Sequence, residues 1–173
     1  VKEYLNIPYL GTVPAMAMDK EGETRLDMVT MHSPKSIASE AYRGIRTGIL
    51  FSSAETEPQV ILVSSSGPIE GKTITTTNLA ITMAQSGSKV IILDCDLRRP
   101  RIHKVFDIPR DQGITNLLVG NKNIKEVVFR TQIPNLNVIP CGPISPNPSE
   151  ILGSTRMTDL LEILKRNYTR III

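Results

Sequence analysis

Cysteine and histidine are scarce in this sequence, and neither residue type forms a cluster. Cys95 and Cys141 lie far apart without a C-x-x-C spacing, and His32 and His103 stand alone. The scarcity argues against a metal site built from these residue types. It favours two reduced, buried thiols in a cytosolic protein.

Long apolar runs and dense positive charge are also missing. No stretch of about 18 apolar residues is present, so we expect no membrane-spanning segment here, and the first residues do not have the pattern of a signal peptide. The 20 lysines and arginines barely exceed the 17 aspartates and glutamates, and no basic run indicates a nucleic-acid partner. With 40% hydrophobic residues, the composition is that of a soluble globular protein with one sizeable core.

An alternation of short apolar runs and helical spacing is the main pattern that is present. The predicted strands are residues 60–64, 90–94, 136–140 and 170–173. The predicted helices are residues 33–51, 73–85, 101–106, 114–119 and 149–167. Strands that alternate with helices imply right-handed crossovers, so we expect an α/β fold with a mainly parallel sheet flanked by helices.

Residues 1–32 are weakly patterned, and we expect them to form an extended linker that leads into the domain at 33–173. Ser33 or Ser36 is expected to cap the first helix of that domain, with Pro34 in the first turn. The sequence does not begin with methionine and ends on three isoleucines, so we expect it to be a piece of a longer protein.

A glycine-bearing turn joins the first predicted strand to the helix at 73–85. It aligns with the phosphate-loop pattern G-x-x-x-x-G-K-[ST] as SGPIEGKT, with Ser66 in place of the first glycine and Gly67 one position later. Loop amides and the N-terminal end of the helix favour a bound anion. We therefore predict a three-layer P-loop NTPase-like domain that binds ATP or ADP with Mg²⁺. The alternative is a turn that contains Gly-Lys-Thr by chance.

The residues predicted to bind the nucleotide are Ser66, Gly67, Pro68, Ile69, Glu70, Gly71, Lys72, Thr73 and Ile74. Within this set, Lys72 is expected to contact the β- and γ-phosphates. The hydroxyl group of Thr73 is expected to bind Mg²⁺.

Two carboxylates follow the strand at 90–94. Asp94 and Asp96 are two residues apart on an extended chain and can face one site at the carboxyl end of the sheet, beside the phosphate loop. There they could bind Mg²⁺ and accept a proton from an attacking hydroxyl group, which makes Lys72, Asp94 and Asp96 the predicted catalytic residues. The alternative is a turn in which the aspartates cap the next helix and pair with Arg98 and Arg99.

Several of these segments together resemble the bacterial tyrosine kinases of capsule and exopolysaccharide synthesis. The similar segments are residues 65–73 (SSGPIEGKT), 92–103 (ILDCDLRRPRIH) and 147–152 (NPSEIL). The second resembles the Walker A′ motif of that family, and residues 157–173 are similar to the stretch that leads into the Walker B strand. Residues 40–46 resemble the E-x-x-R-x-x-R oligomerisation helix, and residues 6–14 resemble the segment that follows a membrane-embedded adaptor.

The resemblance implies a tyrosine autokinase that regulates exopolysaccharide or capsule synthesis and export from the cytoplasmic side of the bacterial inner membrane. Glu40, Arg43 and Arg46 would pair with a neighbouring subunit in a ring-like homo-oligomer. Further implied partners are a transmembrane adaptor region of the same polypeptide and a tyrosine phosphatase. From the residues alone, the simpler interpretation of this helix is a solvated face with i,i+3 ion pairs.

The sequence departs from this family in three respects. The Walker B aspartate would follow Ile173, and the C-terminal tyrosine cluster is absent, so activity of these residues alone is left open. No tyrosine lies between Tyr42 and Tyr168, so we do not expect the internal regulatory tyrosine of some members.

Two other functions stay possible. Partition and septum-placement ATPases share the phosphate loop but carry an additional lysine early in it, whereas this loop has no lysine before Lys72. A non-catalytic module whose assembly is controlled by nucleotide is the second alternative.

Overall fold

The computed structural model describes residues 7–16, 26–52 and 56–173. Its centre is a five-stranded sheet in the order β1-β5-β2-β4-β3. All neighbouring strands are parallel except β3 and β4, which confirms the predicted mainly parallel α/β fold. The strands are β1 (Val60–Ile61), β2 (Val90–Leu93), β3 (Phe129–Arg130), β4 (Leu136–Ile139) and β5 (Arg170–Ile172).

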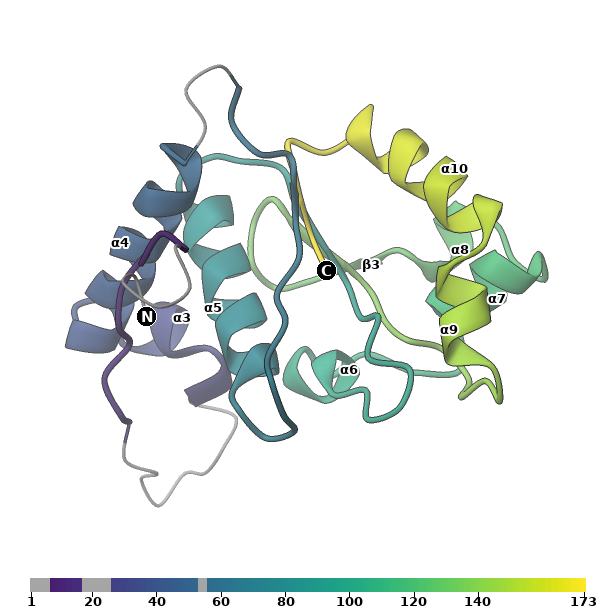
Figure 1. Cartoon of the computed structure of the whole chain (residues 1–173), viewed down its shortest axis with the longest axis horizontal. Coiled ribbons are helices and arrows are strands. Elements are labelled where there is room, and N and C mark those ends of the chain that lie inside the picture. Colours follow the sequence, from purple (N-terminus) through teal and green to yellow (C-terminus); the bar gives the residue numbers. More distant parts are fainter. Residues whose placement is uncertain (1–6, 17–25, 53–55) are drawn as a thin grey trace.

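Helices cover both faces of the sheet, which makes the three layers visible in Figure 1. On one side lie α3 (Val29–His32), α4 (Ile37–Leu50), α5 (Lys72–Gln85) and α6 (Ile102–Val105). On the other lie α7 (Ile114–Val119), α8 (Ile124–Val127), α9 (Pro148–Leu152) and α10 (Thr155–Lys165). None of the helices among the described residues has both the length and the apolar character needed to cross a lipid bilayer.

The side chains of β2 show how one strand serves both layers. Val90 and Ile92 pack in the cluster with α5 and α6, whereas Ile91 and Leu93 pack in the cluster with α7 and α10. All four are buried, as expected for a central parallel strand whose faces are both covered by helices.

Local signals account well for the helices α4 and α5. Of the two candidate caps for α4, Ser36 is the one used, since its side chain accepts a hydrogen bond from the amide of Ser39 at 3.2 Å. Helix α5 is followed by Gly87, whose φ of 93° lies in the left-handed region that glycine adopts without strain.

Two predicted elements are wrong in part, because tertiary contacts outweigh the local pattern. The last residues of the segment predicted as extended form α3, where Thr30 is fully buried against Asn78 of α5. The single helix predicted at 149–167 is divided into α9 and α10. Ser154 donates from its hydroxyl to the carbonyl of Ile151 at 2.7 Å, a side-chain bond that competes with continuation of the helix.

The first strand also differs from its prediction as a buried strand. Among the described strands, β1 lies at the edge of the sheet and pairs with β5; its two residues are half-buried, and Leu62 after it is 71% exposed. Helix α8 and strand β3 were not predicted. They span only four and two residues, which is too short for a recognisable hydrophobic pattern.

Candidate functional site

The phosphate loop connects the end of β1 to the first turn of α5, as the sequence predicts. Gly71 has φ 84° and Ile69 has φ 63°, so both residues lie in the left-handed region. This conformation is uncommon for a β-branched residue, and such strained backbone concentrates at functional sites. Within the described part of the chain, the amides of Gly71, Lys72 and Thr73 donate no hydrogen bond, which leaves them available to an anion.

Lys72 reaches back across the loop. Its Nζ atom donates to Ser65 Oγ at 3.0 Å and lies 3.5 Å from the carbonyl oxygen of Gly67. Ser65 in turn donates from its hydroxyl to the same carbonyl at 2.7 Å. The ammonium group is therefore held over the loop rather than extended into solvent.

Asp94 lies directly after β2 and is only 4% exposed. Burial raises the pKa of this carboxyl group to about 6, although the amide of Ile102 donates to Oδ2 at 3.1 Å and opposes that shift. The bond to Ile102 also anchors the start of α6. The alternative predicted from the sequence, an aspartate that caps the next helix, therefore describes one contact of Asp94. That contact does not prevent Asp94 from also lining the site.

Asp96 is exposed, and its Oδ1 atom accepts from the amides of Arg98 at 3.3 Å and Arg99 at 2.9 Å. These two bonds turn the chain immediately after the strand. They hold the carboxylate at the edge of the sheet, next to the phosphate loop.

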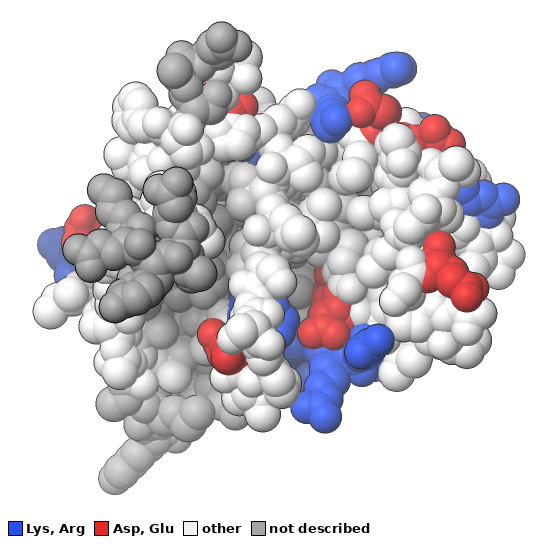
Figure 2. All heavy atoms as spheres, in the orientation of Figure 1, with Lys and Arg blue, Asp and Glu red and all other residues white. Residues whose placement is uncertain are grey.

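Two neighbouring hollows, each of about 360 Å³, bring the predicted residues together. Both are lined by Lys72, Thr73 and Asp96, while Asp94 lines one and residues 68–71 line the other. Figure 2 shows positive and negative side chains meeting at the edge where Figure 1 places α6 and the loop before α5. Ile74 also lines a hollow, whereas Ser66 and Gly67 line neither.

In the hollow that residues 68–71 line, three lining residues were not predicted from the sequence, namely Leu26, Arg99 and Arg101. Arg101 forms an ion pair at 2.8 Å with Asp27, which is 4% exposed and precedes α3. Both arginines belong to the second predicted motif, so their position in it was a usable signal. No local pattern links Leu26 or Asp27 to a loop more than 40 residues away.

The oxygen donors at this site suit Mg²⁺. Among the described residues, no group of three or more histidine, cysteine, aspartate or glutamate side chains could hold a metal. The hydroxyl of Thr73 and the carboxylates of Asp94 and Asp96 line the same hollow. Mg²⁺ prefers oxygen ligands and usually combines one or two carboxylates with water and substrate phosphates, so this smaller donor set fits it.

The three residues predicted to mediate oligomerisation lie on α4, outside these hollows. Glu40 and Arg43 form an i,i+3 ion pair, and Arg43 also donates to the carbonyl of Pro34 at 2.7 Å. Arg46 donates to the carbonyl of Thr82 on α5 at 2.8 Å. All three side chains thus have partners within this chain, and the partner of Glu40 lies on the same helix.

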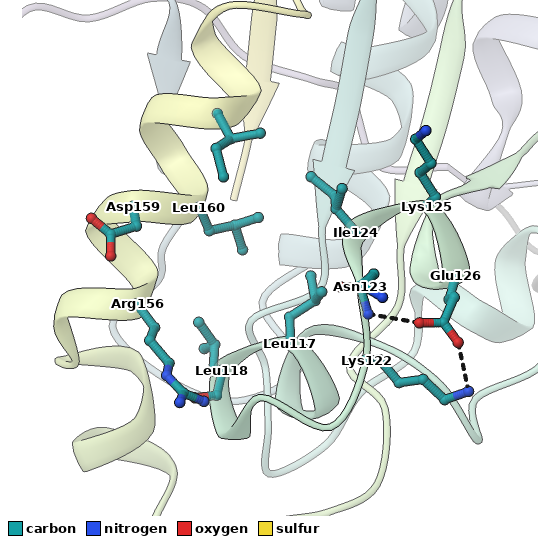
Figure 3. Close-up of a pocket in the computed structure, with 11 residues that line it drawn as sticks. Leu117, Leu118, Lys122, Asn123, Ile124, Lys125, Glu126, Arg156, Asp159 and Leu160 are labelled. Carbon is teal, nitrogen blue, oxygen red and sulfur yellow. Dashed lines mark hydrogen bonds and ion pairs between the residues drawn. The ribbon is translucent and has the colours of Figure 1, made fainter.

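A further hollow, of about 650 Å³, lies between α7, α8 and α10 in the opposite helical layer (Figure 3). Three of its charged groups are engaged in structural contacts: Lys122 pairs with Glu126 at 2.9 Å, and Arg156 donates to the carbonyl of Leu118 at 3.2 Å. It contains none of the predicted site residues. Although it is larger, we place the site at the phosphate loop, where the reactive groups converge.

Comparison with known sequences gives consistent relatives. Residues 59–173 match the family model described as an AAA domain. The chain is 38% identical over 156 residues to the tyrosine-protein kinase CapB of Staphylococcus aureus, covering 90% of this chain and 68% of the relative. It is also 38% identical over 147 residues to the tyrosine-protein kinase YwqD of Bacillus subtilis, covering 84% and 62%. It spans only 20% of the tyrosine-protein kinase Etk of Escherichia coli, at 33% identity.

Solved structures agree with these relatives. The chimerical protein CapA2B2 matches with a TM-score of 0.90 and 34% identity, covering 99% of this chain and 72% of that one. The kinase domain of Escherichia coli ETK matches with a TM-score of 0.87 and 30% identity, covering 98% and 69%. The septum site-determining protein MinD of Pyrococcus horikoshii has a TM-score of 0.57 at 23% identity over 66% of this chain and 47% of its own, which shows a shared fold alone.

Proposed function

Because this chain belongs to the bacterial tyrosine-protein kinase family and has its P-loop nucleotide-binding fold, we propose that its parent protein is an ATP-dependent tyrosine autokinase. The acceptors are tyrosines in the C-terminal segment of an adjacent subunit. The proposal rests chiefly on Lys72, Thr73, Asp94 and Asp96, which meet at the two hollows beside the phosphate loop. The proposal concerns a longer parent protein, because this chain spans only part of its relatives. It covers 68% and 62% of the first two relatives and 24% of a third, from Acinetobacter johnsonii.

In the proposed complex, the loop from Ser66 to Ile74 surrounds the phosphates of ATP. The amides of residues 71–73 donate to phosphate oxygens, and Lys72 places its charge beside the β- and γ-phosphates. Thr73, Asp94 and Asp96 would hold Mg²⁺, which neutralises charge on the phosphates when bound.

The transfer itself requires that the tyrosine hydroxyl be positioned next to the γ-phosphate and that a group accept its proton. The tyrosine oxygen forms a bond to the γ-phosphorus while the bond from that phosphorus to the bridging oxygen breaks, and ADP leaves. The proton of the tyrosine hydroxyl passes to one of the two carboxylates.

The remaining parts of the proposal concern the assembled protein. One relative is described as a kinase of the cps region of Klebsiella pneumoniae, at 30% identity, which supports a role in capsule or exopolysaccharide synthesis and export. We place the domain on the cytoplasmic side of the inner membrane, joined to a transmembrane adaptor and opposed by a tyrosine phosphatase. Glu40, Arg43 and Arg46 are proposed to contact the next subunit of a ring.

Lys72→Met in the full-length parent protein tests the kinase proposal. Incubation with labelled ATP should give strong phosphotyrosine in the wild type and a loss of at least 100-fold in the variant, because the charge beside the phosphates is removed. Lys122→Met, in the opposite layer, is the matched control and should retain the wild-type signal. Unchanged phosphotyrosine in Lys72→Met would overturn the proposal.

The same assay separates the two other functions. ATP turnover without phosphotyrosine would indicate a switch ATPase of the septum-placement kind, whose fold the MinD structure shares. A nucleotide-dependent change in molecular mass, without turnover or phosphotyrosine, would indicate an assembly module.

A further inference from the structure

Glu70 folds back over the phosphate loop instead of extending into solvent. Its carboxylate accepts from the hydroxyl of Ser66 at 3.0 Å to Oε1 and 3.1 Å to Oε2. The amide of Gly67 also donates to Oε2, at 3.0 Å. The side chain therefore cross-links the beginning of the loop to the residue before Gly71. These bonds, the one from Gly67 first, lower the pKa of Glu70, which stays ionised at neutral pH.

This cross-link explains the departure of the loop from the general pattern. Ser66 occupies the position of the first glycine, and its hydroxyl gives the loop a side-chain donor to Glu70 that a glycine there would lack. Glycine also leaves room at the next position, because a Cβ atom there would lie 3.3 Å from Glu70 Oε1 and the carboxylate would have to shift by a few tenths of an ångström. Serine, glycine and glutamate are thus matched to one another across the loop.

The cross-link also acts on the part of the loop that holds Lys72. Residues 65–67 bind Glu70 through Ser66 and Gly67, and they bind the ammonium group of Lys72 through Ser65. Ile69 lies in sequence between Ser66 and Glu70, and its φ of 63° is strained for a β-branched residue. The cross-link therefore spans a strained part of the backbone. Meanwhile the amides of residues 71–73 donate to none of the described groups.

We propose that Ser66 and Glu70 are a positioning pair that keeps the phosphate loop in its binding conformation before the nucleotide arrives. The proposal rests on the nucleotide site proposed above. Holding the loop in advance removes the ordering cost that would otherwise weaken binding. The carboxylate would not occupy the amides that receive phosphate, since its backbone bond is to Gly67.

The experiment measures the dissociation constant of MgADP for the full-length parent protein and a small set of variants. Glu70→Ala removes both bonds and should weaken binding about tenfold, the effect of losing one charged hydrogen bond. Glu70→Gln should stay within about threefold of wild type, because its amide can accept from Gly67 and donate to Ser66. Ser66→Ala should weaken binding, and adding it to Glu70→Ala should cost little more, since the pair acts as one unit.

Two controls isolate positioning from general stability. Glu126→Ala removes an equivalent bond to the amide of Asn123, 2.7 Å long, in the opposite layer and should leave the affinity unchanged. The thermal midpoint of nucleotide-free Glu70→Ala should match that of wild type, since Glu70 is exposed.

The outcomes distinguish this inference from the proposed function. If wild type binds MgADP, Lys72→Met does not, and Glu70→Ala binds like wild type, the positioning pair is wrong while the nucleotide site stands. If Glu70→Ala and Glu70→Gln both bind more tightly than wild type, Glu70 repels phosphate and the inference is also wrong. Failure of wild type to bind the nucleotide would contradict the proposed function itself.

Discussion

Asp94 combines two properties that oppose each other in a folded protein. It is buried at the end of β2, between the two helical layers, yet it belongs to the group of residues proposed to bind a cation. An ionised carboxylate in such surroundings loses the solvation that it has in water, and the bond from Ile102 restores only part of it. The ionised side chain of Asp94 therefore lowers the stability of the fold as long as no cation is bound.

Asp94→Asn should stabilise the nucleotide-free protein in a pH-dependent manner. The folded-state pKa of about 6 lies above the unfolded value of 3.8, so ionisation destabilises the fold above pH 6 and this cost disappears as the pH falls toward 4. Asparagine avoids the cost and can still accept from Ile102. Urea unfolding without Mg²⁺ should show a gain on the order of 2 kcal/mol at pH 8 and little gain at pH 4. An equal gain at both pH values would contradict the burial argument.

The buried side-chain amide of Asn78 joins helix α5 to helix α3 and to the residues before α3. Asn78 is fully buried, and its Oδ1 atom accepts from the amide of Thr30 at 3.0 Å and from its hydroxyl at 2.9 Å. Its Nδ2 atom donates to the carbonyls of Leu26 and Asp27, each at 3.1 Å, and of Ile74 at 2.9 Å. The segment before α4 is thereby attached to the helix that begins at the phosphate loop.

Asn78→Leu should destabilise the fold by about 2–4 kcal/mol, although it keeps the volume of the side chain. The amide and hydroxyl of Thr30 and the carbonyl of Asp27, whose bonds to Asn78 are buried, would lose this partner and find no water to replace it. Asn167→Ala is the control, because its exposed side chain donates to the carbonyl of Ile163 near the end of α10, and the variant should change stability by less than about 0.5 kcal/mol. Denaturant unfolding measures both, and a similar small effect for the two variants would contradict the role of Asn78.

The same elements show where sequence patterns suffice and where they do not. Helix α5 and strand β2 were predicted because glycine and apolar spacing mark their ends locally, and the motifs on them led to the prediction of Lys72, Thr73 and the two aspartates as site residues. Helix α3 was not predicted, since its stability comes from Asn78, 48 residues away from Thr30. Arg101 could have been named from its place in the second motif, but no local pattern predicts its ion pair with Asp27, which lies 74 residues earlier.

At the scale of the whole molecule, the parallel topology brings the phosphate loop and the aspartates to one edge of the sheet. Strand β2 pairs with β5, and β5 pairs with β1, so the segments after β1 and β2 are only one strand apart. Helix α4 packs on α5 in the outer part of the same layer. A subunit that contacts α4 would therefore touch the layer that contains the phosphate loop, which links assembly to the proposed transfer between subunits.

The double variant Glu40→Ala, Arg43→Ala tests that link. Within one chain this exposed i,i+3 pair contributes only about 0.2–0.5 kcal/mol, and the bond from Arg43 to the carbonyl of Pro34 is also exposed, so the thermal midpoint should hardly change. If the pair contacts a neighbouring subunit, light scattering of the full-length protein should show a shift from oligomer to monomer, with phosphotyrosine falling in parallel. Arg46 is left intact, because its bond to Thr82 supports the packing of α4 on α5. Lys122→Ala, Glu126→Ala removes a comparable exposed pair from the opposite layer and should leave the mass unchanged. An unchanged mass for both double variants would show that Glu40 and Arg43 form an ordinary ion pair on a solvent-exposed face of α4.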